Sequence, residues 1–201
     1  MRYIVHLLPD GAQCRAFDDL RARVAAAIGS NRALDYPTAH VTLVWAMQDA
    51  PGDPAPIDQA ALCAVLNGFR QSGVISLPVR PPIDTREHLL LPLENTPALA
   101  ELRHALYVAV RDVVAGSDGA RRERAERVRE QTWPHLTIAQ EITPEHWERG
   151  MAILAAEGDW LREPIVGAEL ALVARDVDRG EPYAITRIPR RSCHKRRCGG
   201  V

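Results

Sequence analysis

The pattern of apolar and polar positions along this chain predicts the same order of elements twice. Strands are indicated where β-branched and aromatic residues alternate with polar ones, and helices where apolar residues recur every three or four positions. In the first half we expect strands at 2–8, 39–47 and 74–80 and helices at 12–28 and 58–71. In the second half we expect strands at 88–93, 134–140, 165–175 and 183–188 and helices at 97–115 and 144–156. The order predicts a duplicated α+β fold, with Pro81-Pro82 between the halves.

One strand in each half carries the same short motif. His40-Val41-Thr42-Leu43 lies in the first half and His135-Leu136-Thr137-Ile138 in the second. Because side chains alternate along a strand, the His and the Thr of each motif share one face and their apolar neighbours take the other. Imidazole can remove or supply a proton near neutral pH, and a hydroxyl can donate to a phosphoryl oxygen. The motifs therefore suit attack on a phosphodiester. The alternative is two ordinary half-buried strands whose histidines bond to nearby carbonyls.

These two motifs resemble the paired H-x-[T/S]-hydrophobic motifs of the two-histidine (2H) phosphoesterase superfamily, which includes 2′-5′ RNA ligase-like proteins and cyclic nucleotide phosphodiesterases. The resemblance spans about residues 1–188. It implies a bilobal α+β fold with pseudo-two-fold symmetry, in which two antiparallel sheets face a central cleft and helices lie outside. We accordingly expect one domain at 1–188, with the break between its lobes near 81–84, and a disordered basic tail at 189–201.

The resemblance also implies roles for the motif residues. His40 and His135 would be the catalytic acid and base, and Thr42 and Thr137 would hold the phosphate. Many relatives place a basic residue shortly after the second motif, where this chain has Gln140-Glu141. Arginines before the second motif would then have to contact the substrate instead.

Charge narrows the class of substrate. The whole chain has a net charge of −1, with 25 basic and 26 acidic residues. Six of the basic residues and none of the acidic ones follow Thr186, so the body of the chain before them has a net charge of −7. A body with this charge is a poor platform for a long polyanion. We therefore expect the partner to be a small nucleotide or a short RNA end.

Several other features are expected to be absent. The sequence has no apolar run long enough to cross a membrane, and its N-terminus does not have the pattern of a signal peptide, so no membrane span or secretion is expected. The four cysteines form no C-x-x-C pair, which favours reduced thiols and a cytoplasmic location. No histidine pair has zinc-helix spacing, so no metal and no cofactor are expected; His194 between Cys193 and Cys198 is a weak alternative metal site. No feature indicates a protein partner, so a monomer is expected.

Aromatic residues near the motifs are the next candidates. Trp133 lies two residues before His135, on the same face, and either stacks a base or packs in the core. Tyr36 is a weaker candidate for the same role. Trp45 alternates with Leu43, so we assign it to the core face.

Two further candidates depend on the surroundings. His6 lies on the first predicted strand and is interpreted as a structural histidine with satisfied hydrogen bonds; the alternative places it on the floor of the cleft. The segment 121–129 is rich in arginine and glutamate and favours a solvated helix with i,i+4 ion pairs. Its alternative is a lid from which Arg122 and Arg124 contact the substrate.

The function predicted from these observations is a metal-independent phosphodiesterase acting at a ribose 2′-oxygen, in a 2′,3′-cyclic phosphate or a 2′-5′-linked nucleotide. We assign His40 as the base and His135 as the acid. Three alternatives remain open at this point: a 2′-5′ ligase-type activity on RNA ends, degradation of cyclic oligonucleotide signals, and a non-catalytic nucleotide- or RNA-binding module.

Overall fold

Helices and strands make up most of the residues that the computed structural model describes, which are 1–30, 32–36, 38–49, 56–71, 74–85, 87–116, 122–176 and 183–189. The strands are β1 (Arg2–Pro9), β2 (Val41–Gln48), β3 (Ile75–Leu77), β4 (Ile83–Asp84), β5 (His88–Pro92), β6 (Arg129–Glu130), β7 (His135–Gln140), β8 (Ile165–Arg175) and β9 (Ala184–Pro189). The α-helices are α1 (Gly11–Ile28), α2 (Gln59–Gly68), α3 (Pro97–Ala115), α4 (Arg122–Arg127) and α5 (Pro144–Ala156). Short 3₁₀ turns are η1 (Arg32–Asp35), η2 (Phe69–Gln71) and η3 (Gly158–Arg162).

Every strand and helix predicted from the pattern is present, with ends within about three residues of those expected. β4 and β6 were not predicted, because two residues are too few to show a period. The tail from residue 190 onward lies outside the described residues. None of the described helices is long and apolar enough to cross a membrane.

Local sequence signals set where the long helices begin. Asp10 caps α1 by accepting hydrogen bonds from the backbone N–H groups of Ala12 and Gln13. Thr96 caps α3 and is followed by Pro97, and Thr143 forms a capping box with His146 at the start of α5. These caps provide acceptors for backbone N–H groups that have no partner within the first turn of each helix.

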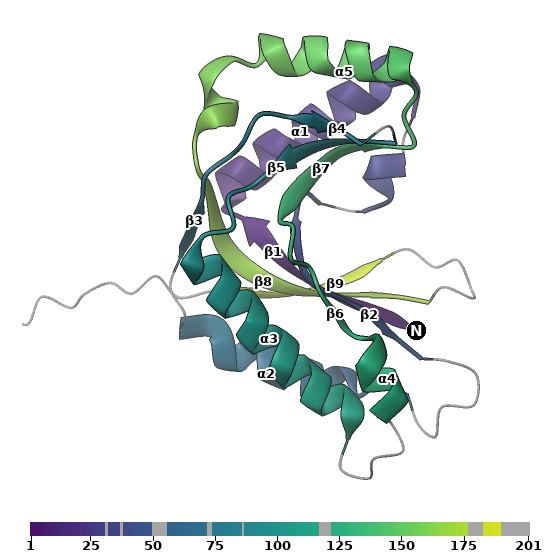
Figure 1. Ribbon diagram of the computed structural model, residues 1–201, viewed down its shortest axis with the longest axis vertical. Coiled ribbons are helices and arrows are strands. Elements are labelled where there is room, and N and C mark those ends of the chain that lie inside the picture. Colours follow the sequence, from purple (N-terminus) through teal and green to yellow (C-terminus); the bar gives the residue numbers. More distant parts are fainter. Residues whose placement is uncertain are drawn as a thin grey trace, which may run out of the picture.

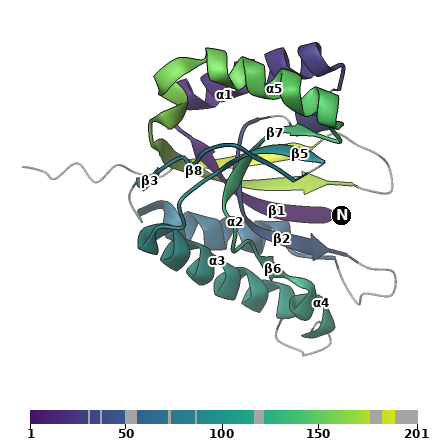
Figure 2. The ribbon, with the colours of Figure 1, turned by 45° about the horizontal axis from the view of Figure 1, so that its top comes forward.

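The strands form an antiparallel sheet in the order β3-β8-β1-β2-β7-β5-β4, with β6 beside β2 and β9 beside β8. The order is symmetric about β2 and β7, since β1 flanks β2 as β5 flanks β7. Only Val41 and Leu136 pair in register between β2 and β7. In place of the two separate sheets predicted, the strands thus form one continuous antiparallel sheet, whose two halves are joined at this pair. Helices α1 and α5 cover one end of the strands and α2, α3 and α4 the other (Figures 1 and 2).

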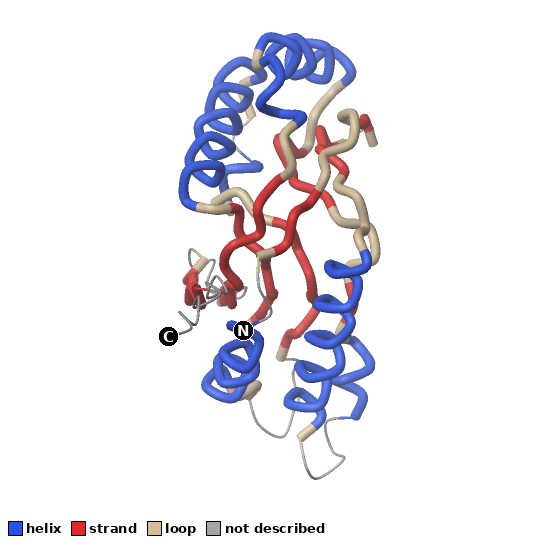
Figure 3. Tube along the Cα trace, turned by 90° about the vertical axis from the view of Figure 1, so that its left-hand side faces the viewer, coloured by secondary structure: helices blue, strands red, loops and turns tan. Residues whose placement is uncertain are grey.

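Each lobe is built from both halves of the sequence. Helix α1, from the first half, packs on β7 and α5, whereas α3, from the second half, packs on β2 and α2. Figure 3 shows the two groups of helices at opposite ends of the molecule, with strands between them. Strand β8, from the second half, likewise pairs with β1 and β3 of the first half. The sequence halves therefore interleave rather than forming one lobe each, and the two motif strands are brought to the centre of the molecule.

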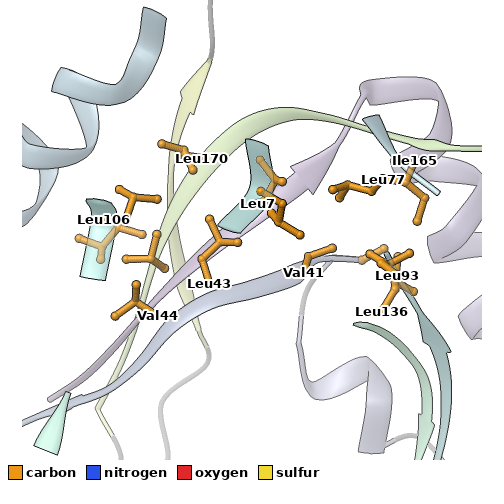
Figure 4. Packing of buried hydrophobic residues seen from close by; sticks show 14 of the residues in the cluster. Leu7, Val41, Leu43, Val44, Leu77, Leu93, Leu106, Leu136, Ile165 and Leu170 are labelled. Atoms are coloured by element: carbon orange, nitrogen blue, oxygen red, sulfur yellow. The ribbon is translucent and has the colours of Figure 1, made fainter. Parts of the chain in front are cut away.

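Leucine and valine side chains on the helix-facing side of the central strands form the core. Leu7, Val41, Leu43 and Leu136 are completely buried. Figure 4 shows Leu106 of α3 beside the β2 side chains and Val41 beside Leu136 at the junction of the lobes. Because the apolar residue after each motif histidine is locked in this core, each His and Thr is held on the opposite face, which we call the motif face.

The register of β2 with β1 corrects the assignment of Trp45 to the core. Tyr3 pairs with Met47 and Val5 with Val44, while His6 pairs with Thr42, so β2 has extra residues at two shifts. As a result Leu43 and Val44 are both buried and Trp45 turns to the motif face, where it is 48% exposed. A simple alternation could not predict this, because the bulge depends on the partner strand.

Candidate active site

Both motif histidines are held by the same backbone contact. His40 Nδ1 donates to the carbonyl oxygen of Thr38 at 2.8 Å, and His135 Nδ1 donates to that of Trp133 at 2.9 Å. A carbonyl only accepts, so the proton of each neutral ring is on Nδ1 and the lone pair is on Nε2. Each ring can therefore take or give a proton at Nε2 while its orientation stays fixed.

The register of the central strands brings the two motifs together. Val41 pairs with Leu136, and the His and the Thr of each motif are the residues directly before and after these two. Because Val41 and Leu136 are both buried, the two histidines and two threonines lie together on the opposite face, where β2 meets β7.

The threonine hydroxyls are open to a ligand. Thr42 and Thr137 are both half-buried. Among the described residues neither hydroxyl has a hydrogen-bond partner, so each can donate to a bound oxygen. This arrangement provides two hydroxyl donors and two imidazoles at one place on the motif face.

His6 corrects the interpretation of a satisfied structural histidine. Its ring lies face to face with that of His40, with centroids 3.8 Å apart and planes at 6°. The residue is 1% exposed, and its Nε2 has no hydrogen-bond partner among the described residues. His6 therefore lies beneath His40, as in the alternative interpretation, and it covers one ring face of the proposed catalytic residue.

The two motif histidines have different surroundings despite the symmetry. His6 pairs across the sheet with Thr42, and the residue at the matching place beside Thr137 is Leu90. His135 is instead flanked by Trp133, whose ring centroid lies 5.0 Å away at a tilt of 46°. The position of Trp133 was predicted from the alternation along the strand, whereas the stacking of His6 on His40 depends on the pairing of β1 with β2 and could not be predicted from the motif.

These surroundings lower the pKa of all three imidazoles. Burial lowers the pKa of His40 to about 4, opposed by its bond to the Thr38 carbonyl and assisted by the charges of Arg21 and His135. Burial also lowers the pKa of His135, opposed by the Trp133 carbonyl and assisted by His88. His6 has its pKa lowered well below its ordinary value by burial and by His40. At neutral pH His40 and His6 are therefore uncharged.

A network on α1 holds the segment that leads into His40. The carboxylate of Asp18 accepts from the backbone N–H of Ala39 at 2.6 Å and from the Thr38 hydroxyl at 3.0 Å. It also pairs with the buried guanidinium of Arg21 at 2.9 Å, and Arg21 donates to the Tyr36 carbonyl at 3.1 Å. These roles could not be predicted, since α1 is distant from the motif in the sequence and its periodicity marks only its apolar face.

Tyr36 packs beside the motif rather than projecting freely. Its ring centroid is 4.8 Å from that of His40 and 4.4 Å from that of Tyr183. Arg175 lies over the Tyr183 ring at 4.7 Å and donates to its hydroxyl at 3.1 Å. Tyr36 therefore forms a wall beside His40, and its role toward a substrate stays a prediction.

Trp133 lies where the sequence placed it, on the face of His135, and is 43% exposed. It does not pack in the core, so its exposure favours the interpretation in which it stacks on a base.

Arg124 is not available as a lid side chain, which corrects that alternative. It is 2% exposed, and its guanidinium lies 3.6 Å from the carboxylate of Asp49. Helix α4 packs on α3 and β2 and buries Ala125, and Val128 directly after it is also buried, so it is not a fully solvated helix either. The side chain of Arg122 lies outside those described.

Other features lie away from this cluster. A cavity of about 500 Å³ is lined by residues of α5, η3 and 79–82 and includes none of the motif residues. In the described part of the chain no three His, Cys, Asp or Glu residues are grouped so as to hold a metal ion. Cys14 is buried and Cys63 half-buried, both as free thiols. Cys193, His194 and Cys198 lie outside the described residues.

Comparison with solved structures identifies the fold. TT0787 of Thermus thermophilus matches 96% of this chain and 100% of its own, with a TM-score of 0.56 and 17% identity. E. coli LigT, in a crystal structure with ATP, matches 93% of each chain with a TM-score of 0.44 and 15% identity. No protein-family model matches the sequence, and no curated protein matches it significantly. A TM-score below 0.5 does not establish a shared fold, so the first match carries the comparison. The chain has the fold of TT0787.

Proposed function

We propose that this chain is a phosphoesterase of the 2H type. It hydrolyses a phosphodiester at a ribose 2′-oxygen, in a 2′,3′-cyclic phosphate or a 2′-5′-linked nucleotide, without a metal ion. The observation that supports this most directly is the matched pair of tethers, in which His40 and His135 each donate Nδ1–H to a carbonyl two residues earlier. Two imidazoles fixed in this way, each beside a threonine hydroxyl, suit in-line displacement at phosphorus.

In the proposed reaction His40 Nε2 takes a proton from a water molecule, whose oxygen forms the new bond to phosphorus. The bond from phosphorus to the departing ribose oxygen breaks, and His135 gives its Nε2 proton to that oxygen. Thr42 and Thr137 donate to the non-bridging oxygens as charge gathers there. The protons balance, since one enters from water at His40 and one leaves from His135.

The assignment of His40 as base rests on its surroundings. A base must be uncharged before the reaction, and His40 is covered by His6 and has a pKa of about 4. His135 adjoins Trp133 rather than a second imidazole, and a bound phosphate beside it would favour its protonated form. The pseudo-symmetric pair thus has one member suited to accept a proton and one suited to give it.

A substrate panel tests the proposed function. Ribonucleoside 2′,3′-cyclic phosphates, 2′-5′ dinucleotides, 3′-5′ dinucleotides and cyclic dinucleotides are incubated with the protein in excess EDTA, and products are followed by phosphorus NMR. Turnover of the first or second class, undiminished by EDTA, is expected. Turnover only of cyclic dinucleotides would move the function to signal degradation. Tight binding without any turnover would identify a binding module, and joining of RNA ends would identify a ligase.

The two pKa shifts also predict an acidic optimum for kcat/KM. His40 is lowered to about 4, so the neutral base is present above that pH. The pKa of His135 is lowered below 6.5, so the protonated acid of the free enzyme is lost before neutrality. We expect a bell-shaped profile with its maximum between about pH 4 and 6.5 and a decline of about tenfold per unit on the alkaline side. An optimum at pH 8 or above would contradict this assignment.

A further inference from the structure

Two tryptophans stand out on the motif face because they are not packed. Trp45 is 48% exposed and Trp133 43% exposed, and they are the aromatic residues among the exposed large apolar side chains of the described part. A Trp side chain can bury about 150–250 Å² of surface. Single exposed apolar residues are common, so what matters is where these two lie.

The pairing of β6 with β2 places Trp45 and Trp133 along the same stretch of the motif face. β6 pairs with β2 so that Arg129 lies opposite Trp45 and Glu130 opposite Val44. The backbone N–H of Gln131 then donates to the Leu43 carbonyl at 3.0 Å, and the segment continues into β7. The residues from β6 to His135 thus run along β2 from Trp45 to the motif. We call Trp45, Arg129 and Trp133 the tryptophan strip.

The tryptophan strip includes the cationic side chain of Arg129, and the carboxylate of the neighbouring Glu130 points to the opposite face. Glu130, on the other face, accepts from Arg103 at 2.8 Å and from His104 at 3.3 Å, both on α3. Arg129 is exposed, and its guanidinium donates to the backbone carbonyls of Glu126 and Val128. Among the described residues Arg129 forms no ion pair with a carboxylate, so its charge is presented beside Trp45.

The spacing suits a chain of nucleotides rather than one. Trp133 adjoins His135, whereas Trp45 lies three residues beyond Thr42, about 10 Å along the strand. The nucleotide whose phosphate lies at the histidines can reach Trp133, but a base on Trp45 must belong to a further nucleotide. Stacking on an aromatic ring does not depend on base identity and requires no basic platform, which agrees with the acidic body of the chain.

We propose that the tryptophan strip binds the flanking nucleotides of a single-stranded oligonucleotide, so that the substrate is an oligonucleotide end rather than a mononucleotide. This inference rests on the proposed function and specifies its substrate class. Bases stack on Trp133 and Trp45, and Arg129 contacts a phosphate between them.

Oligoribonucleotides of one to six nucleotides that end in a 2′,3′-cyclic phosphate test the strip. The value of kcat/KM is expected to rise with the length of the oligonucleotide. Trp45→Ala is expected to make the increase from one to six nucleotides about tenfold smaller, since the stacking of a base on Trp45 is lost. Arg129→Ala is expected to lower the slope of log kcat/KM against log salt by about one. Val108→Ala removes an equally exposed apolar side chain from α3 and serves as the matched control.

A binding measurement separates this inference from the proposed function. A 2′-O-methyl oligonucleotide, which cannot be turned over, is titrated against the chain while tryptophan fluorescence is followed. Quenching that strengthens with length and is lost in Trp45→Ala supports the strip even if no substrate is hydrolysed. Turnover that is equal for all lengths, or an equal loss in Trp45→Ala for one nucleotide and for six, would overturn it.

Discussion

Replacing His135 with alanine is expected to slow hydrolysis of a 2′,3′-cyclic phosphate by about 10³-fold but to spare an ester whose leaving group needs no proton. A general acid contributes about 10²–10⁴-fold when the leaving group is a poor one, such as a ribose oxygen. With a p-nitrophenyl nucleotide ester that lacks a neighbouring hydroxyl, we expect the variant to retain activity within about tenfold of the unaltered chain.

His40→Ala is the contrasting variant in this experiment. The water must still lose a proton whatever the leaving group, so both substrates are expected to lose about 10²–10³-fold. His104→Ala, which changes an exposed histidine of α3, is the control for loss of an imidazole as such. Rescue of His40→Ala and not of His135→Ala by the activated ester would reverse the two roles. Full activity of either variant on the cyclic phosphate would remove that histidine from the reaction.

Asp18→Ala is expected to lower kcat by about 10²-fold with a smaller change in KM. Asp18 does not touch the proposed substrate site; it holds the backbone of Ala39 and the hydroxyl of Thr38, whose carbonyl orients His40. A misplacement of about 1 Å can cost about 10²-fold. Because the buried guanidinium of Arg21 would lose this carboxylate, the free energy of unfolding is also expected to fall by about 1–3 kcal/mol, measured in urea.

Two variants distinguish positioning from general destabilisation. Asp18→Asn keeps one acceptor for the Ala39 N–H and is expected to recover part of kcat, although it loses the charge that pairs with Arg21. Asp19→Ala, on the exposed side of α1, is expected to change neither kcat nor stability. If Asp18→Ala lowered stability and left kcat unchanged at a temperature where it is folded, Asp18 would have only a structural role.

The elements and the motif face could be predicted because both depend on neighbours in the chain. Alternation within the first motif sets Val41 and Leu43 against His40, and the core then fixes that alternation. The caps at Asp10 and Thr96 likewise act within one turn of helix. The roles of the histidines could be proposed from residue type, because imidazole can accept or donate a proton near neutral pH and the same His/Thr motif occurs on two strands.

The predictions that failed depended on residues far apart in the sequence. Trp45 faces out because the bulge in β2 arises from its register with β1, a strand near the N-terminus. His6 lies beneath His40 for the same reason, and Arg124 is buried because Asp49 and α3 surround it. In each case the sequence showed the spacing of the side chains along the strand or helix, but it did not show which distant strand, helix or residue that element would contact.

Short-range patterns were therefore enough to predict the strands, the helices and two His/Thr faces, since these follow from periods of about 2 and 3.6 residues and from local caps. Three-dimensional packing was needed to establish that the halves interleave, that Val41 pairs with Leu136 where the two motif strands meet, and that His6 covers the ring of His40. The physical reason is that the register of a strand depends on how its buried face packs against residues distant in the sequence. A short segment does not contain the information that identifies its partner strand.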